Sequence, residues 1–251
     1  TTVASFSADF AIGAVDGDQE RTAFDFKYEV GLTTSFTGED SLDVVLAAGT
    51  GTLTEFDLAQ DQGSTLVVDG ISYTLPLGDK LTAFVSHGVE GSALFNTACV
   101  YEGPSDTLSS CGNVSSALDE DVNTSAGATY DFGNGFTASI GYEGQGDSTA
   151  GLATKQGLDA YAGQLSYATD TYGVSITGAR IETSETEDDT FTALNAFFSP
   201  EEGGIPSISV GYEWGVDGSA ASADEKTSSY FVGLQWDELG EGVFGIAAGT
   251  H

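Results

Sequence analysis

The sequence predicts an all-β fold: a transmembrane up-and-down antiparallel β-barrel of about 14 to 16 strands in the full protein. Three observations predict it. Apolar and polar residues alternate along nearly the whole chain of 251 residues, which is the period of a strand with two different faces. Residues 24–36 alternate without a break, over a length that crosses a hydrocarbon layer even when tilted. Short turns alternate with longer acidic loops along the chain. A membrane barrel has this alternation because the short turns lie at one of its ends and the long loops at the other.

The alternation predicts about thirteen strands and no helix. In the first half they are expected at 4–14, 24–36, 41–49, 71–77, 81–88, 128–132 and 136–143. In the second half they are expected at 161–167, 172–181, 190–198, 207–214, 229–236 and 243–250. Because bacterial barrels have even strand numbers, we expect a further strand beyond His251 or one strand miscounted. Residues 1–251 are interpreted as one barrel domain.

The two faces of these strands differ in the way a membrane barrel requires. The polar face carries mostly Ser, Thr, Gly and Ala with scattered Asp, and small residues suit a crowded concave wall. The apolar face places aromatic residues near strand ends, where girdles at a lipid interface are found. These residues are Tyr73, Tyr142, Tyr172, Trp214, Tyr230 and Trp236. The sequence alone leaves open that each aromatic residue makes ordinary packing contacts.

The lengths of the connections distinguish the two ends of the predicted barrel. Short turns are expected at 37–41, 78–80, 133–135, 168–171, 199–206 and 237–242. The connections between them are longer and acidic, and residues 88–125 form the longest. A β-sandwich with crossing connections has no physical reason for this alternation. A membrane barrel has one, because its turns on the periplasmic side are short and its loops on the extracellular side are long.

The charge balance narrows the classes of partner. The chain has 39 acidic and 6 basic residues, a formal net charge of -33. Such a field repels phosphate backbones, and the bases form no cluster, so nucleic-acid binding is excluded. Cations are attracted instead, and the same charge equally fits adaptation to a salty medium.

No catalytic constellation stands out. The two histidines, His87 and His251, lack an accompanying nucleophile motif. Glycine patterns such as Gly133–Gly135 lie between two strands, so they predict turns and no phosphate cradle. We therefore expect no enzyme activity and no cofactor.

Cys99 and Cys111 lie in the longest loop, in the stretch ACVYEGPSDTLSSC. Without zinc-site spacing they are interpreted as one disulfide in an oxidising compartment, with free thiols as the alternative. We expect this loop, which also holds Asp119, Glu120 and Asp121, to fold into the barrel or cap it, stiffened by the disulfide. Calcium or magnesium at 119–121 and 185–189 is weighed against a solvated acidic rim.

Four stretches resemble a known family. VGLTTSFTGEDSLDVVLAAG, ISYTLPLGDKLTAFVS, AGATYDFGNGFTASIGY and WDELGEGVFGIAAGT are similar to cyanobacterial outer-membrane porins, the iron-uptake porins related to carbohydrate-selective, OprB-like porins. The resemblance implies a homotrimeric barrel in the outer membrane. It also implies an N-terminal domain that binds peptidoglycan or another cell-wall polymer, which is missing before Thr1, and further strands beyond His251. The motifs are turns and strands, so they identify the scaffold better than the solute.

In such a barrel the charges of the polar face line the pore. By parity we expect these to be Asp9, Asp25, Lys27, Glu29, Asp43, Glu143, Arg180 and Glu213. Carboxylates around a narrow aqueous passage favour cations. Each charge has the alternative role of lining a wide wet wall or pairing with a neighbour.

The sequence therefore predicts an outer-membrane porin for passive, cation-favouring diffusion of small hydrophilic solutes and inorganic ions. One alternative is a secreted, acidic all-β binding or adhesion protein. The other is a plugged barrel with a structural role in the envelope. The transported solute, including iron, does not follow from the residues.

Overall fold

The protein is a single curved sheet of thirteen antiparallel strands, paired in the order of the chain. The computed structural model describes residues 1–15, 21–50, 63–101, 111–118, 124–146, 149–200, 204–218, 225–239 and 242–250. The strands of the first half are β1 (Val3–Val15), β2 (Arg21–Thr34), β3 (Ser41–Gly49), β4 (Gly63–Pro76), β5 (Leu81–His87), β6 (Thr124–Gly133) and β7 (Phe136–Gly144). Those of the second half are β8 (Asp159–Ala168), β9 (Tyr172–Glu182), β10 (Asp188–Phe198), β11 (Ser207–Asp217), β12 (Glu225–Leu239) and β13 (Gly242–Gly249). No helix in the described part of the chain is long and apolar enough to span a membrane.

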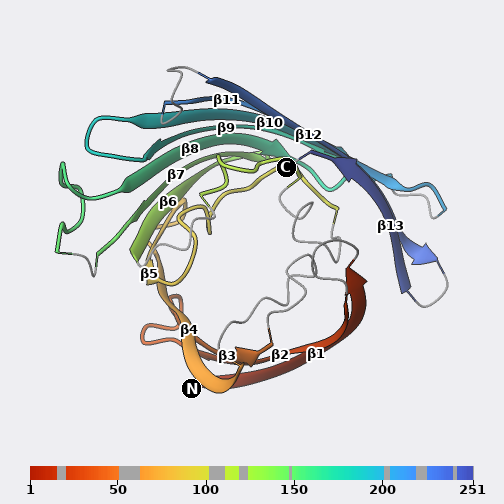
Figure 1. Cartoon of the computed structure of the whole chain (residues 1–251), viewed down its shortest axis with the longest axis horizontal. Helices are drawn as coiled ribbons and strands as arrows, with labels where there is room; N and C mark the ends of the chain where they lie inside the picture. Colours follow the sequence, from red (N-terminus) through yellow and green to blue (C-terminus); the bar gives the residue numbers. More distant parts are fainter. Residues whose placement is uncertain are drawn as a thin grey trace.

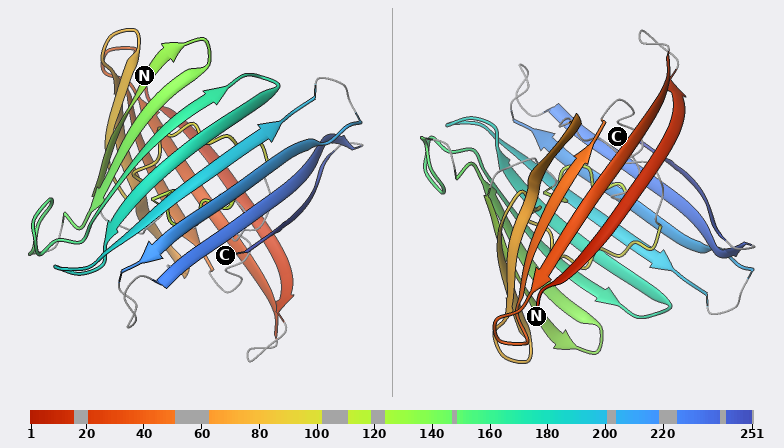
Figure 2. Two further views of the ribbon diagram at one scale, coloured as in Figure 1. Left: turned by 90° about the horizontal axis from the view of Figure 1, so that it is seen from above. Right: turned by 90° about the horizontal axis from the view of Figure 1, so that it is seen from below.

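The sheet bends round into a ring. Figure 1 looks along this ring and shows β1 and β13 as its two edge strands, lying on the same side. Figure 2 shows the strands inclined across the wall, with the N-terminus at the end that carries the short turns. The predicted up-and-down topology is confirmed, because every strand pairs antiparallel with its neighbour in sequence.

The connections keep the predicted alternation. At one end, which we call the short-turn end, β6 and β7 are joined across Asn134, whose φ of 57° gives the left-handed conformation of a tight hairpin turn. At the other, the long-loop end, residues 88–123 join β5 to β6 and residues 145–158 join β7 to β8.

The register separates two faces along each strand. Leu165 of β8 pairs with Ile176 of β9 on the outer face, and Gln164 pairs with Thr177 on the inner face. The outer face exposes large apolar side chains: Leu165 is 61% exposed and Ile140 65%. The inner face buries polar ones, including Ser125, Ser139, Ser166, Ser175, Thr177, Asn195 and Ser209. A soluble protein places these two classes the other way round.

Three strands begin four or more residues before the alternation predicts. β4 begins at Gly63 and not at 71, β6 at Thr124 and not at 128, and β12 at Glu225 and not at 229. In β4 the pairing with β3 shifts between Val45 and Leu46, so Asp69 is an extra residue that breaks the period-two pattern. The early residues of β12 are polar and give no apolar face to detect.

The turn at 35–40 is organised by one carboxylate. Asp40 Oδ1 accepts hydrogen bonds from Ser35 Oγ at 2.6 Å, from Thr37 Oγ1 at 2.6 Å and from Thr37 N at 2.7 Å. Its Oδ2 accepts from Tyr73 Oη of β4 at 2.7 Å. These donors, the Ser35 and Thr37 hydroxyls first, hold the pKa of Asp40 well below its usual range.

We predict that Asp40→Asn lowers the thermal stability of the folded barrel at pH 7. The lowered pKa means that the carboxylate stabilises the fold above the unfolded pKa of about 3.9, and that this contribution is lost as the pH falls towards the folded pKa. The melting temperatures of wild type and variant, measured in detergent, should therefore differ at pH 7 and converge in strong acid. A difference that is constant with pH contradicts this role.

Candidate functional site

A loop lies inside the ring. Its described parts, residues 88–101 and 111–118, connect β5 to β6, and we call them the inner loop. Figure 1 shows them passing through the interior and not over the rim. The sequence prediction that this loop folds into the barrel or caps it is resolved in favour of the interior.

A disulfide ties the two parts of the inner loop together. Cys99 and Cys111 are bonded, with their Cα atoms 6.2 Å apart, so the disulfide prediction is confirmed over the free-thiol alternative. Cys111 is fully buried, where it packs with Tyr101 of the loop and Phe231 of β12. The rings of Tyr101 and Phe231 lie 5.3 Å apart in an edge contact. The bridge is therefore seated against the wall and not held free in the interior.

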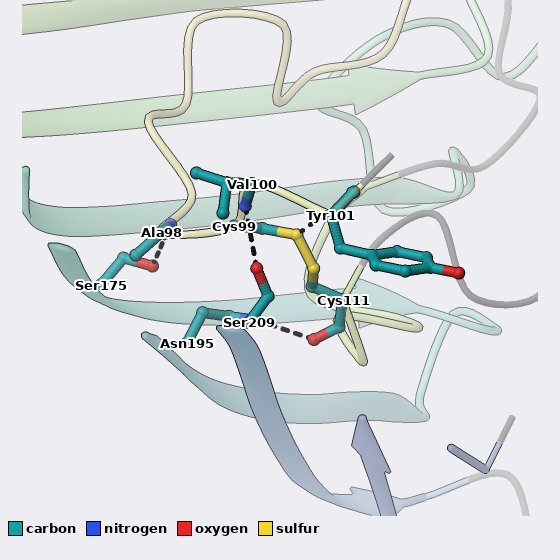
Figure 3. The surroundings of a disulfide bond; sticks show 8 residues. All are labelled: Ala98, Cys99, Val100, Tyr101, Cys111, Ser175, Asn195 and Ser209. Atoms are coloured by element: carbon teal, nitrogen blue, oxygen red, sulfur yellow. Dashed lines mark hydrogen bonds between the residues drawn. A yellow bond between two sulfur atoms is a disulfide. The ribbon is translucent and has the colours of Figure 1, made fainter. Parts of the chain in front are cut away.

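Hydrogen bonds from small wall residues hold the loop beside the disulfide (Figure 3). Ala98 N donates to Ser175 Oγ of β9 at 2.9 Å, and Val100 N donates to Ser209 Oγ of β11 at 3.0 Å. Asn195 Nδ2 of β10 donates to Cys111 O at 2.8 Å. These three strands supply partners for backbone groups that a loop without regular structure leaves unpaired.

Two inner-face glutamates hold the ends of the loop. Glu143 of β7 is fully buried, and its Oε1 accepts from Gly91 N at 2.6 Å. Glu213 of β11 is 4% exposed, and its carboxylate accepts from Ser115 N at 3.1 Å and from Ser116 N at 2.8 Å. Charge-assisted bonds to backbone N–H groups are about twice as strong as neutral ones, and they offset the cost of burying the carboxylates.

Glycine lets the loop approach the wall closely. A Cβ atom on Gly211 of β11 would overlap the carbonyl oxygen of Cys111. One on Gly141 of β7 would overlap the carbonyl oxygen of Gly91. Since backbone atoms occupy both places, a side chain at either position displaces the loop.

The opposite wall carries a different set of charges. On the inner face, Asp9 of β1 lies opposite Lys27 of β2 in the strand register. Lys27 Nζ forms an ion pair with Glu29 Oε1 at 3.2 Å. On β3, Asp43 accepts from Thr33 Oγ1 and Ser41 Oγ, both at 2.6 Å. The hydrogen bonds of the inner loop named above all go to strands between β7 and β11. We call Asp9, Lys27, Glu29 and Asp43 the charged wall.

The eight charges predicted to line the pore thus fall into three groups. Asp9, Asp25, Lys27, Glu29 and Asp43 lie on the inner face of β1, β2 and β3. Asp25 is 1% exposed and accepts from Thr50 Oγ1 at 2.8 Å. Glu143 and Glu213 also lie on the inner face, under the inner loop.

Arg180 does not lie on the inner face, where the sequence analysis expected it. Its register on β9 places it opposite Tyr161, on the outer face, and it is exposed. The prediction of an inner-face Arg180 is wrong: Val174 and Ile176 have the same parity and lie on the outer face, so the alternation itself places Arg180 outside, and only its charge suggests the polar face. Near the end of a strand both faces meet water, so side-chain polarity no longer reports the face.

The serines and the asparagine that hold the loop were not singled out from the sequence. Ser175, Ser209 and Asn195 look like every other small polar residue of the inner face. Their contacts join residues 77, 109 and 84 positions apart in the chain. No local sequence pattern predicts contacts between residues so far apart in the chain.

No metal site is formed by the described residues. Within them, including 185–189, no group of three or more His, Cys, Asp or Glu side chains converges so that it could hold a metal ion. The acidic run 119–121 lies outside the residues that the structure describes.

Comparison with known proteins identifies the fold. No protein-family model and no curated protein matches the chain. Among solved structures, OprB of Pseudomonas putida has a TM-score of 0.61 at 12% identity, covering 97% of this chain and 74% of that one. A substituted form of the Rh. blastica porin has a TM-score of 0.54 at 13% identity, covering 99% and 94%. The chain has the fold of bacterial porins, and at these identities the likeness concerns the fold alone.

We predict that Gly211→Ala loosens the inner loop, because the new methyl group displaces Cys111. The amides of Ala98 and Val100, which bond to the wall beside it, should exchange with deuterium faster than in wild type. Gly178→Ala is the matched control, since a Cβ at Gly178 of β9 meets nothing within 4 Å. Equal protection in both variants contradicts the close approach.

Proposed function

We propose that this chain is an outer-membrane porin for passive, cation-favouring diffusion of small hydrophilic solutes and inorganic ions. One observation carries the proposal: the inner loop is held against one side of a porin-fold ring, and the charged wall lies across from it. A loop held in this way narrows a barrel. No residue is proposed to be catalytic.

The outer face supports placement in a membrane. Its side chains are apolar and exposed along the middle of the strands, as at Ile140, Leu165 and Ile176. Aromatic pairs occur towards the strand ends: the rings of Tyr142 and Tyr161 lie 5.3 Å apart, and those of Phe136 and Tyr167 4.5 Å apart. Apolar bands between aromatic girdles are the outer surface of membrane barrels.

Cation preference is assigned to the charged wall. Its three carboxylates, on Asp9, Glu29 and Asp43, outnumber the single ammonium of Lys27, and a net negative wall attracts cations. Glu143 and Glu213 are bonded to the loop backbone, so we assign them to fixing the shape of the passage.

The assembly and its partners follow from the family resemblance. We extend the proposal to a homotrimer in the outer-membrane lipid, anchored to peptidoglycan or another cell-wall polymer through an N-terminal domain. The sheet edges at β1 and β13 fit the expected closure by further strands. Gel filtration of the full-length protein in detergent measures the trimer.

The proposal predicts stepwise conductance in a planar bilayer and a cation-selective reversal potential under a salt gradient. Glu29→Gln combined with Asp43→Asn removes two of the three carboxylates of the charged wall, so the reversal potential should move towards zero. Glu39→Gln, in the exposed turn at the short-turn end, is the control and should leave it unchanged. A folded protein that gives no conductance steps would contradict the proposal.

We also predict that Cys99→Ser, or reduction of the disulfide, changes the single-channel conductance. The chain-entropy estimate for so short a loop is about 3 kcal/mol, and loss of the bridge frees Cys99 and Cys111 to separate. The readout is the size and noise of the conductance steps. Steps identical to those of the oxidised protein mean that the bridge does not shape the passage.

A further inference from the structure

A pocket opens on the outer face at the long-loop end. It has a volume of about 430 Å³ and lies over β8, β9 and β10. The side chains that give it its chemistry are Lys155, Tyr161, Arg180, Glu182, Glu185 and Asp188. We call it the outer-wall pocket. It is separate from the interior, because Tyr161 and Arg180 share the outer face.

One side of the pocket is built by a loop that is hydrogen-bonded to the end of the wall. Residues 149–158 project from the outer side of the ring between β7 and β8 (Figure 1). Ala153 N donates to Tyr142 Oη and to Asp159 Oδ1, both at 3.2 Å, and Tyr142 Oη donates to the same Asp159 oxygen. Asp159 is 2% exposed. This buried junction fixes the loop and so places Lys155 at the pocket.

The pocket offers fixed donors beside fixed acceptors. Arg180 Nη2 lies 2.7 Å from Asp188 Oδ2 and 3.9 Å from Glu182 Oε1. A guanidinium has five N–H donors, so contacts made by Nη2 do not exhaust it. Tyr161 adds an aromatic surface that is 40% exposed.

The charge of the pocket indicates which lipid headgroups it can bind. Four carboxylates line it, on Asp159, Glu182, Glu185 and Asp188, against the two positive charges of Lys155 and Arg180. A phosphate placed here meets like charges, which disfavours it. Hydroxyl groups both donate and accept, so they satisfy carboxylates and cations together. An uncharged sugar, with several hydroxyls and one flat apolar face for Tyr161, fits this set.

Below the pocket, the outer face continues into an apolar strip. The cross-strand pair Gly163 and Gly178 comes first and leaves the wall without side chains, since a Cβ at Gly178 would meet nothing within 4 Å. Beyond it lie Leu165 and Ile176, which are 61% and 44% exposed. A ligand with a sugar at one end and an acyl chain at the other follows this path.

We propose that the outer-wall pocket binds the sugar headgroup of an uncharged membrane glycolipid, with its acyl chain lying over the glycine pair. The inference rests on the proposed placement of the barrel in a membrane. It does not depend on conduction, because the pocket and the passage lie on opposite faces of the wall.

The test is native mass spectrometry of the folded protein in detergent, titrated with a dihexosyl diacylglycerol. Phosphatidylglycerol with the same acyl chains and the free disaccharide are the comparison probes. We expect a glycolipid adduct that neither comparison probe matches at equal concentration. Arg180→Gln should weaken it about tenfold or more, as loss of hydrogen bonds to a charged group does. Lys226→Gln, an exposed outer-face cation of β12 outside the pocket, should leave it unchanged.

Three results overturn the inference: phosphatidylglycerol retained as well as the glycolipid, the disaccharide bound as tightly as the lipid, or Arg180→Gln without effect. Retention of the native mobility of the unheated protein on a gel verifies that each variant is folded. A protein that conducts but retains no glycolipid contradicts this inference alone. A protein that retains the glycolipid but does not conduct contradicts the proposed function alone.

Discussion

The hydrogen bonding of the inner loop to the wall is the interaction on which the interior depends. The described parts of the loop contain no strand or helix, so their backbone groups need partners within the barrel. Ser175, Ser209 and Asn195 supply some of them, and the carboxylates of Glu143 and Glu213 supply others. Small polar side chains on one face, which a soluble core would exclude, are therefore what the interior requires.

This requirement divides the acidic residues by task. A carboxylate under the loop is buried and accepts hydrogen bonds from backbone N–H groups, so its charge holds the loop in position. A carboxylate on the charged wall, such as Asp43, bonds to hydroxyls and keeps its place across from the loop. Residues of one chemical type on one face thus have two roles, and only the position of the loop separates them.

Much of the fold follows from a period of two. Because successive side chains point to opposite faces, alternation over residues 24–36 predicts β2 and its inner residues, although the strand begins at Arg21 and ends at Thr34, before the turn that contains Ser35 and Phe36. The period fails at Asp69, where an extra residue breaks it. At Arg180 the period holds, because Val174 and Ile176 share its outer face, and only the charge of the side chain suggested the polar face. The partners of the inner loop were beyond sequence reasoning, since Glu213 and Ser116 are 97 residues apart and nothing local relates them.

The central claim, that the apolar face meets lipid while the polar face encloses the loop, is tested most directly by fluorescence. Both tryptophans of the chain, Trp214 and Trp236, lie on the outer face, opposite Ser228 and Phe244 respectively. In liposomes made with lipids brominated on the acyl chains, the account predicts strong quenching of tryptophan emission and weak quenching by acrylamide in the water. Emission that acrylamide quenches and brominated lipid does not would contradict it.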